Sequence, residues 1–138
     1  MQLNPYLSFN GKCEAAFKFY EQCLGGKIVF MMTYGDSPMA EQAPPEWRNK
    51  ILHATLSVGN AVLQGADSPP EHYEEIKGFS IAMSTTDPAE AERIFQVLAE
   101  KGTVRMPLQK TFWAERFGML VDQFGVPWMV NCEQEKPA

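Results

Sequence analysis

The strongest constraint on the fold is an internal repeat that relates the two halves of this 138-residue chain. At an offset of 76 residues the halves share identical or similar residues in the same order: Glu14-Ala15 and Glu90-Ala91, Phe19 and Phe95, Gly26 and Gly102, Ile28 and Val104. Each half reads as a strand, a helix that ends near glycine, and three further strands. Self-similarity on this scale predicts two copies of one βαβββ unit and an α+β fold.

The first half contains one predicted helix, at residues 12–24, where apolar side chains recur every three or four residues and Gly25-Gly26 follows. Strands are predicted at residues 3–9, 27–35, 51–59 and 61–67. The polar, proline-bearing stretch 36–46 is expected to be a loop, either a lid or a plain connection.

The second half opens with a predicted strand at residues 78–85. Asp87 as N-cap, Pro88 at the first helical position and Glu90 two residues later predict a helix that ends at Gly102. Three more strands are expected at residues 103–109, 116–122 and 126–133, and Asp122 is expected to cap the turn before the last one. The expected organisation is an N-terminal module at 1–67, a linker at 68–77 and a C-terminal module at 78–134, in one compact domain.

Composition restricts the partners of the chain. The chain is 45% hydrophobic and 12% aromatic, which is enough to form a core. A net charge of −5 without any cluster of Lys and Arg argues against nucleic acid. No apolar run approaches the ~20 residues that span a bilayer, so no membrane partner is expected. The first residues lack the pattern of a secretory signal, and the three cysteines form no disulfide pattern, so we expect a cytoplasmic protein.

Three segments carry a resemblance to a known family: PYLSFNGKCEAAFKFY followed by LGG, ILHATLSVGNAVLQGAD, and PLQKTFWAERFGMLVDQFGVPWMVN. Together they resemble the vicinal-oxygen-chelate superfamily, which includes glyoxalases, bleomycin resistance proteins and extradiol dioxygenases, and within it the PhnB-like branch. The resemblance implies two βαβββ modules that form curved mixed sheets around a central cavity, with the helices on the outer face. It also implies a small-molecule ligand and a homodimer.

The alternation of side chains divides the strands into a strongly apolar face and a mixed face. The apolar set, which includes Leu52, Ala54, Leu56, Val58 and Trp128, is expected to lie under the helices. The mixed set is expected to contact ligand in the cavity, with simple exposure to solvent as the alternative; its members include His53, Thr55, Gln64, Ser80, Met129 and Asn131.

Many members of the superfamily bind a divalent ion through His and Glu on the first and last strand of each module. The corresponding residues of this chain are Pro5, Gln64, Ser80 and Met129. Proline and methionine cannot bind a hard ion, and serine and glutamine bind it weakly. We therefore expect no metal. We expect no cofactor either, because no Gly-rich strand-to-helix turn of the nucleotide-binding type is present.

Two groups of residues are candidates for chemistry. His53 is the only imidazole in the predicted sheet, and it is either a general acid/base or a histidine hydrogen-bonded to its neighbours. In the segment FWAERFG, Trp113 and Phe117 are candidates to line a pocket, and Glu115 and Arg116 to bind a charged group. The alternative for this segment is aromatic packing at the edge of the core and an exposed ion pair.

The leading functional hypothesis is a protein that binds a small organic molecule between its half-sheets without a catalytic metal. The first alternative is an enzyme of glyoxalase, lyase or dioxygenase type that uses His53 or a displaced metal site. The second alternative is an interaction module whose cavity is completed by another chain.

Overall fold

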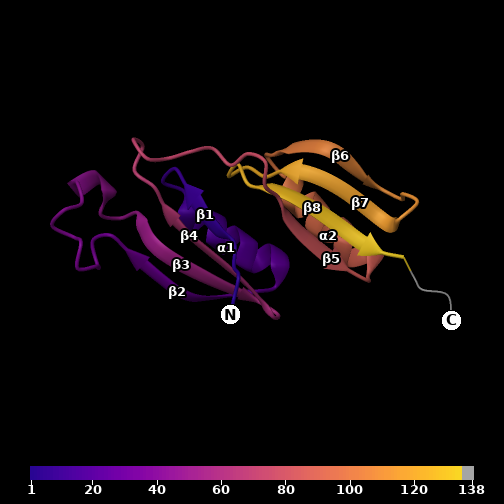
Figure 1. The fold of residues 1–138 in the computed structure, drawn as a ribbon, viewed down its shortest axis with the longest axis horizontal. Coiled ribbons are helices and arrows are strands. Elements are labelled where there is room, and N and C mark those ends of the chain that lie inside the picture. Colours follow the sequence, from indigo (N-terminus) through magenta and orange to yellow (C-terminus); the bar gives the residue numbers. More distant parts are fainter. Residues whose placement is uncertain (135–138) are drawn as a thin grey trace. The chain divides into compact units, whose positions relative to one another are not determined.

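The computed structural model describes residues 1–134. The chain divides into two compact units, Met1–Glu74 and Glu75–Ala138, and this division lies inside the stretch 68–77 that was predicted to be the linker. Each unit is a four-stranded mixed sheet with one α-helix against one of its faces (Figure 1). No helix among the described residues is long and apolar enough to cross a membrane.

The first unit follows the predicted order of elements. It contains β1 (Tyr6–Phe9), α1 (Cys13–Leu24), β2 (Lys27–Thr33), a 3-10 turn η1 (Pro45–Trp47), β3 (Ile51–Val58) and β4 (Ala61–Asp67). The strand order in the sheet is β1-β4-β3-β2, and β1 is parallel to β4 while the other neighbours are antiparallel.

The second unit repeats this plan. It contains β5 (Ile81–Thr85), α2 (Pro88–Ala99), β6 (Thr103–Gln109), β7 (Ala114–Val121) and β8 (Pro127–Glu133). Its order, β5-β8-β7-β6, has the same sequence of first, fourth, third and second strand, again with one parallel pair. The α+β class and the two βαβββ modules are therefore confirmed. β1 and β5 each begin three residues later than predicted, and β7 begins two residues earlier.

The helices bury the apolar stripes that predicted them. In α1 the buried residues are Cys13, Ala16, Phe17, Tyr20 and Cys23, and in α2 they are Ala91, Ile94, Phe95 and Leu98. Residues that match at offset 76 are not always buried to the same degree. Phe19 is half-buried, whereas its counterpart Phe95 is buried. The sequence repeat thus describes the order of elements rather than equivalent packing.

The two helices end differently. Gly25 ends α1 in the left-handed conformation, with φ of 70°, as predicted. The prediction that Gly102 ends α2 was wrong: the helix ends at Ala99, and the left-handed residue is Lys101, with φ of 58°. Gly102 is instead required by close packing, because a Cβ there would collide with the backbone of Val121.

The predicted alternation of faces is largely confirmed. Ala54 and Leu56 of β3 are buried, while His53 and Thr55 are half-buried. The assignment of Leu52 to the buried face was wrong. Its neighbour Ile51 is buried instead, and an irregularity in the β2–β3 pairing lies opposite this end of β3. A bulge moves the pattern by one residue, which alternation alone cannot reveal.

Asp122 caps the turn between β7 and β8, as predicted. Its Oδ1 accepts hydrogen bonds from the backbone N–H groups of Phe124 and Val126, at 2.8 and 3.0 Å. Its Oδ2 accepts one from the indole of Trp128, at 2.8 Å. The carboxylate and the indole are both buried, so Trp128 belongs to the core under α2.

Candidate functional site

The face of the N-terminal sheet that α1 does not cover carries a row of hydrogen-bonded polar side chains. The Tyr6 hydroxyl lies 3.0 Å from Nδ1 of His53, and Nε2 of His53 lies 3.1 Å from the Thr55 hydroxyl. The three residues come from β1 and β3, which are separated in the sheet by β4. Strand alternation places them on one face, because Leu7 and Ala54 on the other face are buried.

Two further side chains border this row. Gln64 of β4 is paired with Tyr6 on one side and with Thr55 on the other, so its amide lies between them on the same face. The ring of Phe30 lies 5.7 Å from that of His53, and the ring of Tyr6 lies 5.6 Å from it. The imidazole is therefore held between two aromatic rings and two hydroxyl groups.

This geometry determines what the imidazole can do. Both of its ring nitrogens are engaged, one as donor and the other as acceptor, and the two hydroxyl groups complement either tautomer. Such a row can transfer a proton along its length or hold the hydroxyl groups in fixed positions for a ligand. Partial burial raises the pKa of Tyr6, with smaller contributions from Cys13 and Tyr34, so its phenol stays protonated.

Five predicted site residues of the second unit lie either around Phe117 or at a pocket near the start of β5. Phe117 and Asn131 are direct partners on β7 and β8, and the ring of Trp113 lies 5.4 Å from that of Phe117. Ser80 lies just before β5 and lines a pocket together with Met129. Met129 is paired with Ala82 of β5, so it lies on the same face as Asn131.

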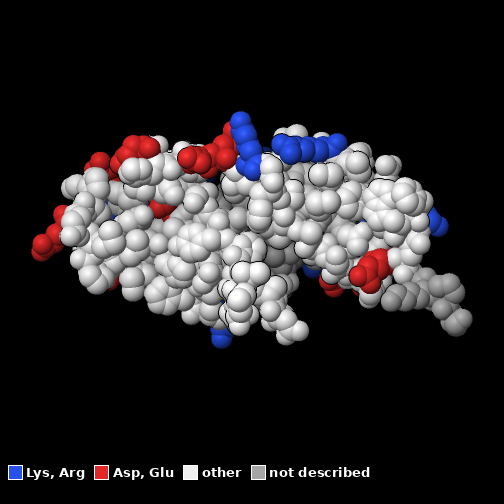
Figure 2. Space-filling view, viewed as in Figure 1, with Lys and Arg blue, Asp and Glu red and all other residues white. Residues whose placement is uncertain are grey.

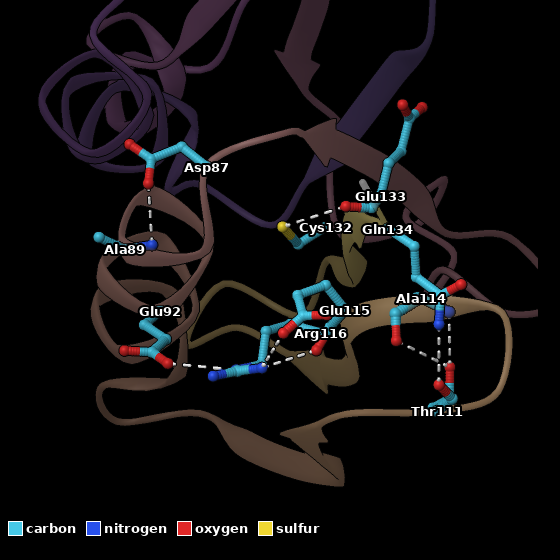
Figure 3. Close-up of polar contacts among 10 residues, drawn as sticks. All are labelled: Asp87, Ala89, Glu92, Thr111, Ala114, Glu115, Arg116, Cys132, Glu133 and Gln134. Carbon is cyan, nitrogen blue, oxygen red and sulfur yellow. Dashed lines mark hydrogen bonds and ion pairs between the residues drawn. The ribbon is translucent and has the colours of Figure 1, made fainter. Parts of the chain in front are cut away.

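Glu115 and Arg116 lie apart from these aromatic residues. Arg116 is paired with buried Cys132, and its Nε lies 3.2 Å from a carboxylate oxygen of Glu92 on α2 (Figure 3). Its Nη1 contacts the Glu115 side chain at 3.2 Å and the Glu115 carbonyl oxygen at 2.8 Å. The guanidinium therefore lies on the helix side of the sheet, between two carboxylates whose combined negative charge exceeds its single positive charge.

The residues at the metal positions of the superfamily do not fit a divalent ion. The β1 residue that is paired with Gln64 is Tyr6 rather than Pro5, which precedes the strand. In the second unit the pair is Ala82 and Met129. An amide, a neutral phenol, a methyl group and a thioether are not the donors that a catalytic ion requires. Within residues 1–134 no group of three or more His, Cys, Asp or Glu side chains could hold an ion.

Tyr6 and Phe30 were missed by sequence reasoning, for different reasons. Tyr6 alternates with buried Leu7 and could have been placed by strand parity. Phe30 follows a pairing irregularity between Ile28 and Phe30, so parity gives the wrong face there. The face visible in Figure 2 is mostly free of Lys, Arg, Asp and Glu, and most of those that it shows lie along its edge.

Comparisons with known proteins agree with this architecture. Residues 2–130 match the family model described as Glyoxalase/Bleomycin resistance protein/Dioxygenase superfamily. Protein YjdN of Escherichia coli (strain K12) is 33% identical over 145 residues, which cover 99% of each chain. Protein PA1353 from Pseudomonas aeruginosa, which has a crystal structure, is 52% identical to this chain in sequence. The two structures superpose with a TM-score of 0.90, over 98% of this chain and 99% of that one.

A further solved structure has the same fold at lower identity. It is a putative 3-demethylubiquinone-9 3-methyltransferase, PhnB protein, from Bacillus cereus. It is 25% identical, with a TM-score of 0.82 over 96% of this chain and 99% of that one. The family match covers nearly the whole chain, and the paired βαβββ units have the expected topology. The chain belongs to the Glyoxalase/Bleomycin resistance protein/Dioxygenase superfamily.

Proposed function

We propose that this protein binds a small organic molecule on the uncovered face of its N-terminal sheet, and that it does so without a transition metal. The observation that carries the proposal is the row formed by Tyr6, His53 and Thr55. Polar side chains that are held in place by each other beside aromatic rings are typical of ligand-binding sites.

The chemistry of the face indicates the kind of ligand. The Tyr6 phenol and the Gln64 amide can donate hydrogen bonds, and Phe30 supplies an aromatic surface beside them. Met32, which is paired with His53, adds an adaptable apolar side chain. The ligand is therefore a partly aromatic or apolar molecule that carries a carbonyl, hydroxyl or similar acceptor. The second-unit residues Ser80, Trp113, Glu115, Arg116, Phe117, Met129 and Asn131 remain predicted ligand contacts.

We place the chain in the PhnB-like branch, which the similarity to the Bacillus cereus PhnB protein supports. The name of that protein refers to a methyltransferase, and we do not propose methyl transfer for this chain. Its sequence lacks the Gly-rich strand-to-helix turn through which nucleotide-type cofactors are commonly bound.

Ligand screening of chelator-treated protein tests the proposal. Small aromatic carbonyl and hydroxyl compounds are screened by thermal shift, and hits are mapped by NMR onto the N-terminal sheet. His53→Ala and Thr55→Val should each weaken a hit about tenfold, because each removes a hydrogen-bonding partner from the row. Thr103→Val, at an exposed position of β6, is the matched control and should change nothing. Hits that bind only after a divalent ion is restored would contradict the proposal.

Acid/base catalysis at His53 is the second candidate. The row of hydroxyl, imidazole and hydroxyl favours it, because such a row can move a proton between Tyr6 and Thr55. If the protein turns over a hit from the screen, His53→Ala should abolish turnover, while Tyr6→Phe should alter its pH profile. A His53→Ala variant with unchanged turnover would exclude this candidate.

A further inference from the structure

A cavity lies in the first unit, and its lining residues differ from those of the row on the sheet. It has a volume of about 540 Å³ and is formed by the long connection between β2 and β3 and by residues 69–72, which follow β4. Neither His53 nor any other member of the row lines it. The cavity is therefore a separate candidate site, and it was not foreseen from the sequence.

The segments that surround this cavity are anchored to the sheet. The Tyr34 hydroxyl donates to the carbonyl oxygen of Asp67 at 2.9 Å, which ties the start of the connection to the end of β4. Gly35 N–H donates to the Arg48 carbonyl oxygen at 2.9 Å and closes the base of the connection. His72 N–H donates to the Pro69 carbonyl oxygen at 2.8 Å and forms a turn on the opposite side. These bonds hold the walls of the cavity in place.

The lining of the cavity suits an aromatic or apolar body. Trp47 and Met39 contribute a flat indole and a flexible thioether, and Pro44, Pro69 and Pro70 contribute rigid apolar rings. Prolines lose little entropy when a ligand packs against them, because their backbone is already restricted.

The lining of the cavity contains two carboxylates. They belong to Glu46 and Glu71; the imidazole of His72 also lines the cavity, and no Lys or Arg is among the lining residues. Within residues 1–134 neither carboxylate forms an ion pair. A cation in the cavity would thus meet two carboxylates and the face of an indole, and both attract positive charge.

The indole of Trp47 also lacks a partner. Its Nε1 is buried, and none of the atoms in the described part of the chain accepts a hydrogen bond from it. A buried donor without an acceptor is costly and calls for a specific explanation. Because Nε1 is not exposed to the cavity, a ligand acceptor can reach it only if the indole ring rotates toward the cavity.

We propose that this cavity is a binding site for a small amphipathic cation, namely an ammonium group attached to an aromatic or apolar body that also carries a hydroxyl acceptor. The ammonium group binds between Glu46 and Glu71 and the ring packs on Trp47 and the prolines. The hydroxyl oxygen accepts from the indole N–H after the indole ring rotates toward the cavity.

Three matched probes test this assignment on the full-length protein. 2-Amino-1-phenylethanol carries all three features, 2-phenylethylamine lacks the hydroxyl, and mandelate replaces the ammonium group with a carboxylate. The chain has three tryptophans, so its NMR spectrum has three indole N–H resonances, and the Trp47→Phe spectrum assigns the one that belongs to Trp47. Titration should shift this resonance, while that of core Trp128 stays in place. The expected order of affinity is aminophenylethanol, phenylethylamine, mandelate.

Substitutions separate the contributions of the two carboxylates and of the indole to the affinity for the amines. Glu46→Gln combined with Glu71→Gln should weaken both amines about fivefold or more. The matched double variant Glu90→Gln and Glu100→Gln, at exposed positions of the second unit, should leave them unchanged. Trp47→Phe should reduce the affinity of aminophenylethanol to that of phenylethylamine, and His53→Ala should have no effect on either amine. The proposal is overturned if none of the probes shifts the Trp47 resonance, if mandelate binds as tightly as the amines, or if the glutamine variant binds them unchanged.

Discussion

At the scale of single residues, the buried carboxylate of Asp67 connects three segments of the N-terminal unit. Its Oδ1 accepts from the N–H of Cys13 at the start of α1, and its Oδ2 accepts from the N–H of Ile51 at the start of β3, at 2.9 and 2.8 Å. Asp67 itself ends β4 and is 1% exposed. A carboxylate with two acceptor oxygens satisfies two backbone donors that would otherwise be buried and unpaired.

Asp67→Asn should therefore destabilise the protein by about 2 to 3 kcal/mol, because the amide replaces one acceptor with a donor that faces a backbone N–H. Urea denaturation followed by circular dichroism measures the change. Glu14→Gln, at an exposed position one residue from Cys13, is the control and should lie within about 0.5 kcal/mol of the parent protein. Equal stability of the two variants would contradict the role of Asp67.

The site residues could be predicted from the sequence only where strand alternation is regular. His53, Thr55 and Gln64 were placed on one face of the N-terminal sheet by parity, and the structure brings them together. Parity treats every strand as unbroken, so it could not place Phe30, which follows a bulge. It also could not show that Arg116 extends toward α2, because that depends on a side chain 24 residues away in sequence.

At the scale of elements, the repeated glycines illustrate how one sequence signal can have two physical causes. Gly25-Gly26 and Lys101-Gly102 occupy corresponding positions after α1 and α2. The first residue of each pair is left-handed, whereas the second lies so close to a neighbouring strand that a Cβ would collide with a backbone carbonyl oxygen. Glycine at a helix end therefore predicted a turn correctly without revealing which residue makes it.

This difference gives a paired prediction. Lys101→Gly should stabilise the protein by about 0.5 to 1 kcal/mol, because lysine is strained at φ of 58° and glycine is not. Gly102→Ala should destabilise it by about 1 to 3 kcal/mol, because the added methyl group must displace the backbone of β7 near Val121.

Thermal and urea unfolding of the two variants measures these changes. The changes in the free energy of unfolding should have opposite signs at these two adjacent residues. If both substitutions destabilise the protein equally, the assignment of the left-handed position to Lys101 is incorrect.

The N-cap of α2 is a feature that the local sequence alone is sufficient to predict. Asp87 was predicted as the cap, and its Oδ1 accepts from the Ala89 N–H at 3.0 Å. The reason is that capping depends on residues two or three apart and needs no knowledge of the rest of the chain. In contrast, the cavity bordered by Trp47 and Pro69 joins segments that are separated by about twenty residues, and no local signal places them together.

At the scale of the whole molecule, the order of helices and strands could be predicted because the sequence contains an internal repeat. Two copies of a strand, a helix and three strands give the same sheet order in both units. The strand bounds were less certain, since hydrogen bonding between strands rather than composition determines where β1 and β5 begin.

We further propose that the protein is a homodimer. Phe112 and Trp113 are exposed, and their ring centroids lie 4.7 Å apart, so they form one apolar patch. A contiguous exposed apolar patch is typical of an interface. Sedimentation equilibrium should give twice the mass of the 15.5 kDa chain. A monomer at all concentrations up to those used for NMR would contradict the proposal.

The most direct test of the central claim is an NMR titration of chelator-treated protein, labelled on its histidine rings, with the tightest compound from the thermal-shift screen. The imidazole of His53 lies between Tyr6, Phe30 and Thr55. A ligand on this face must therefore shift its ring resonances. We expect saturable shifts at His53, and none at exposed His72, with chelator present throughout. Shifts at His53 that appear only after a divalent ion is added would contradict it.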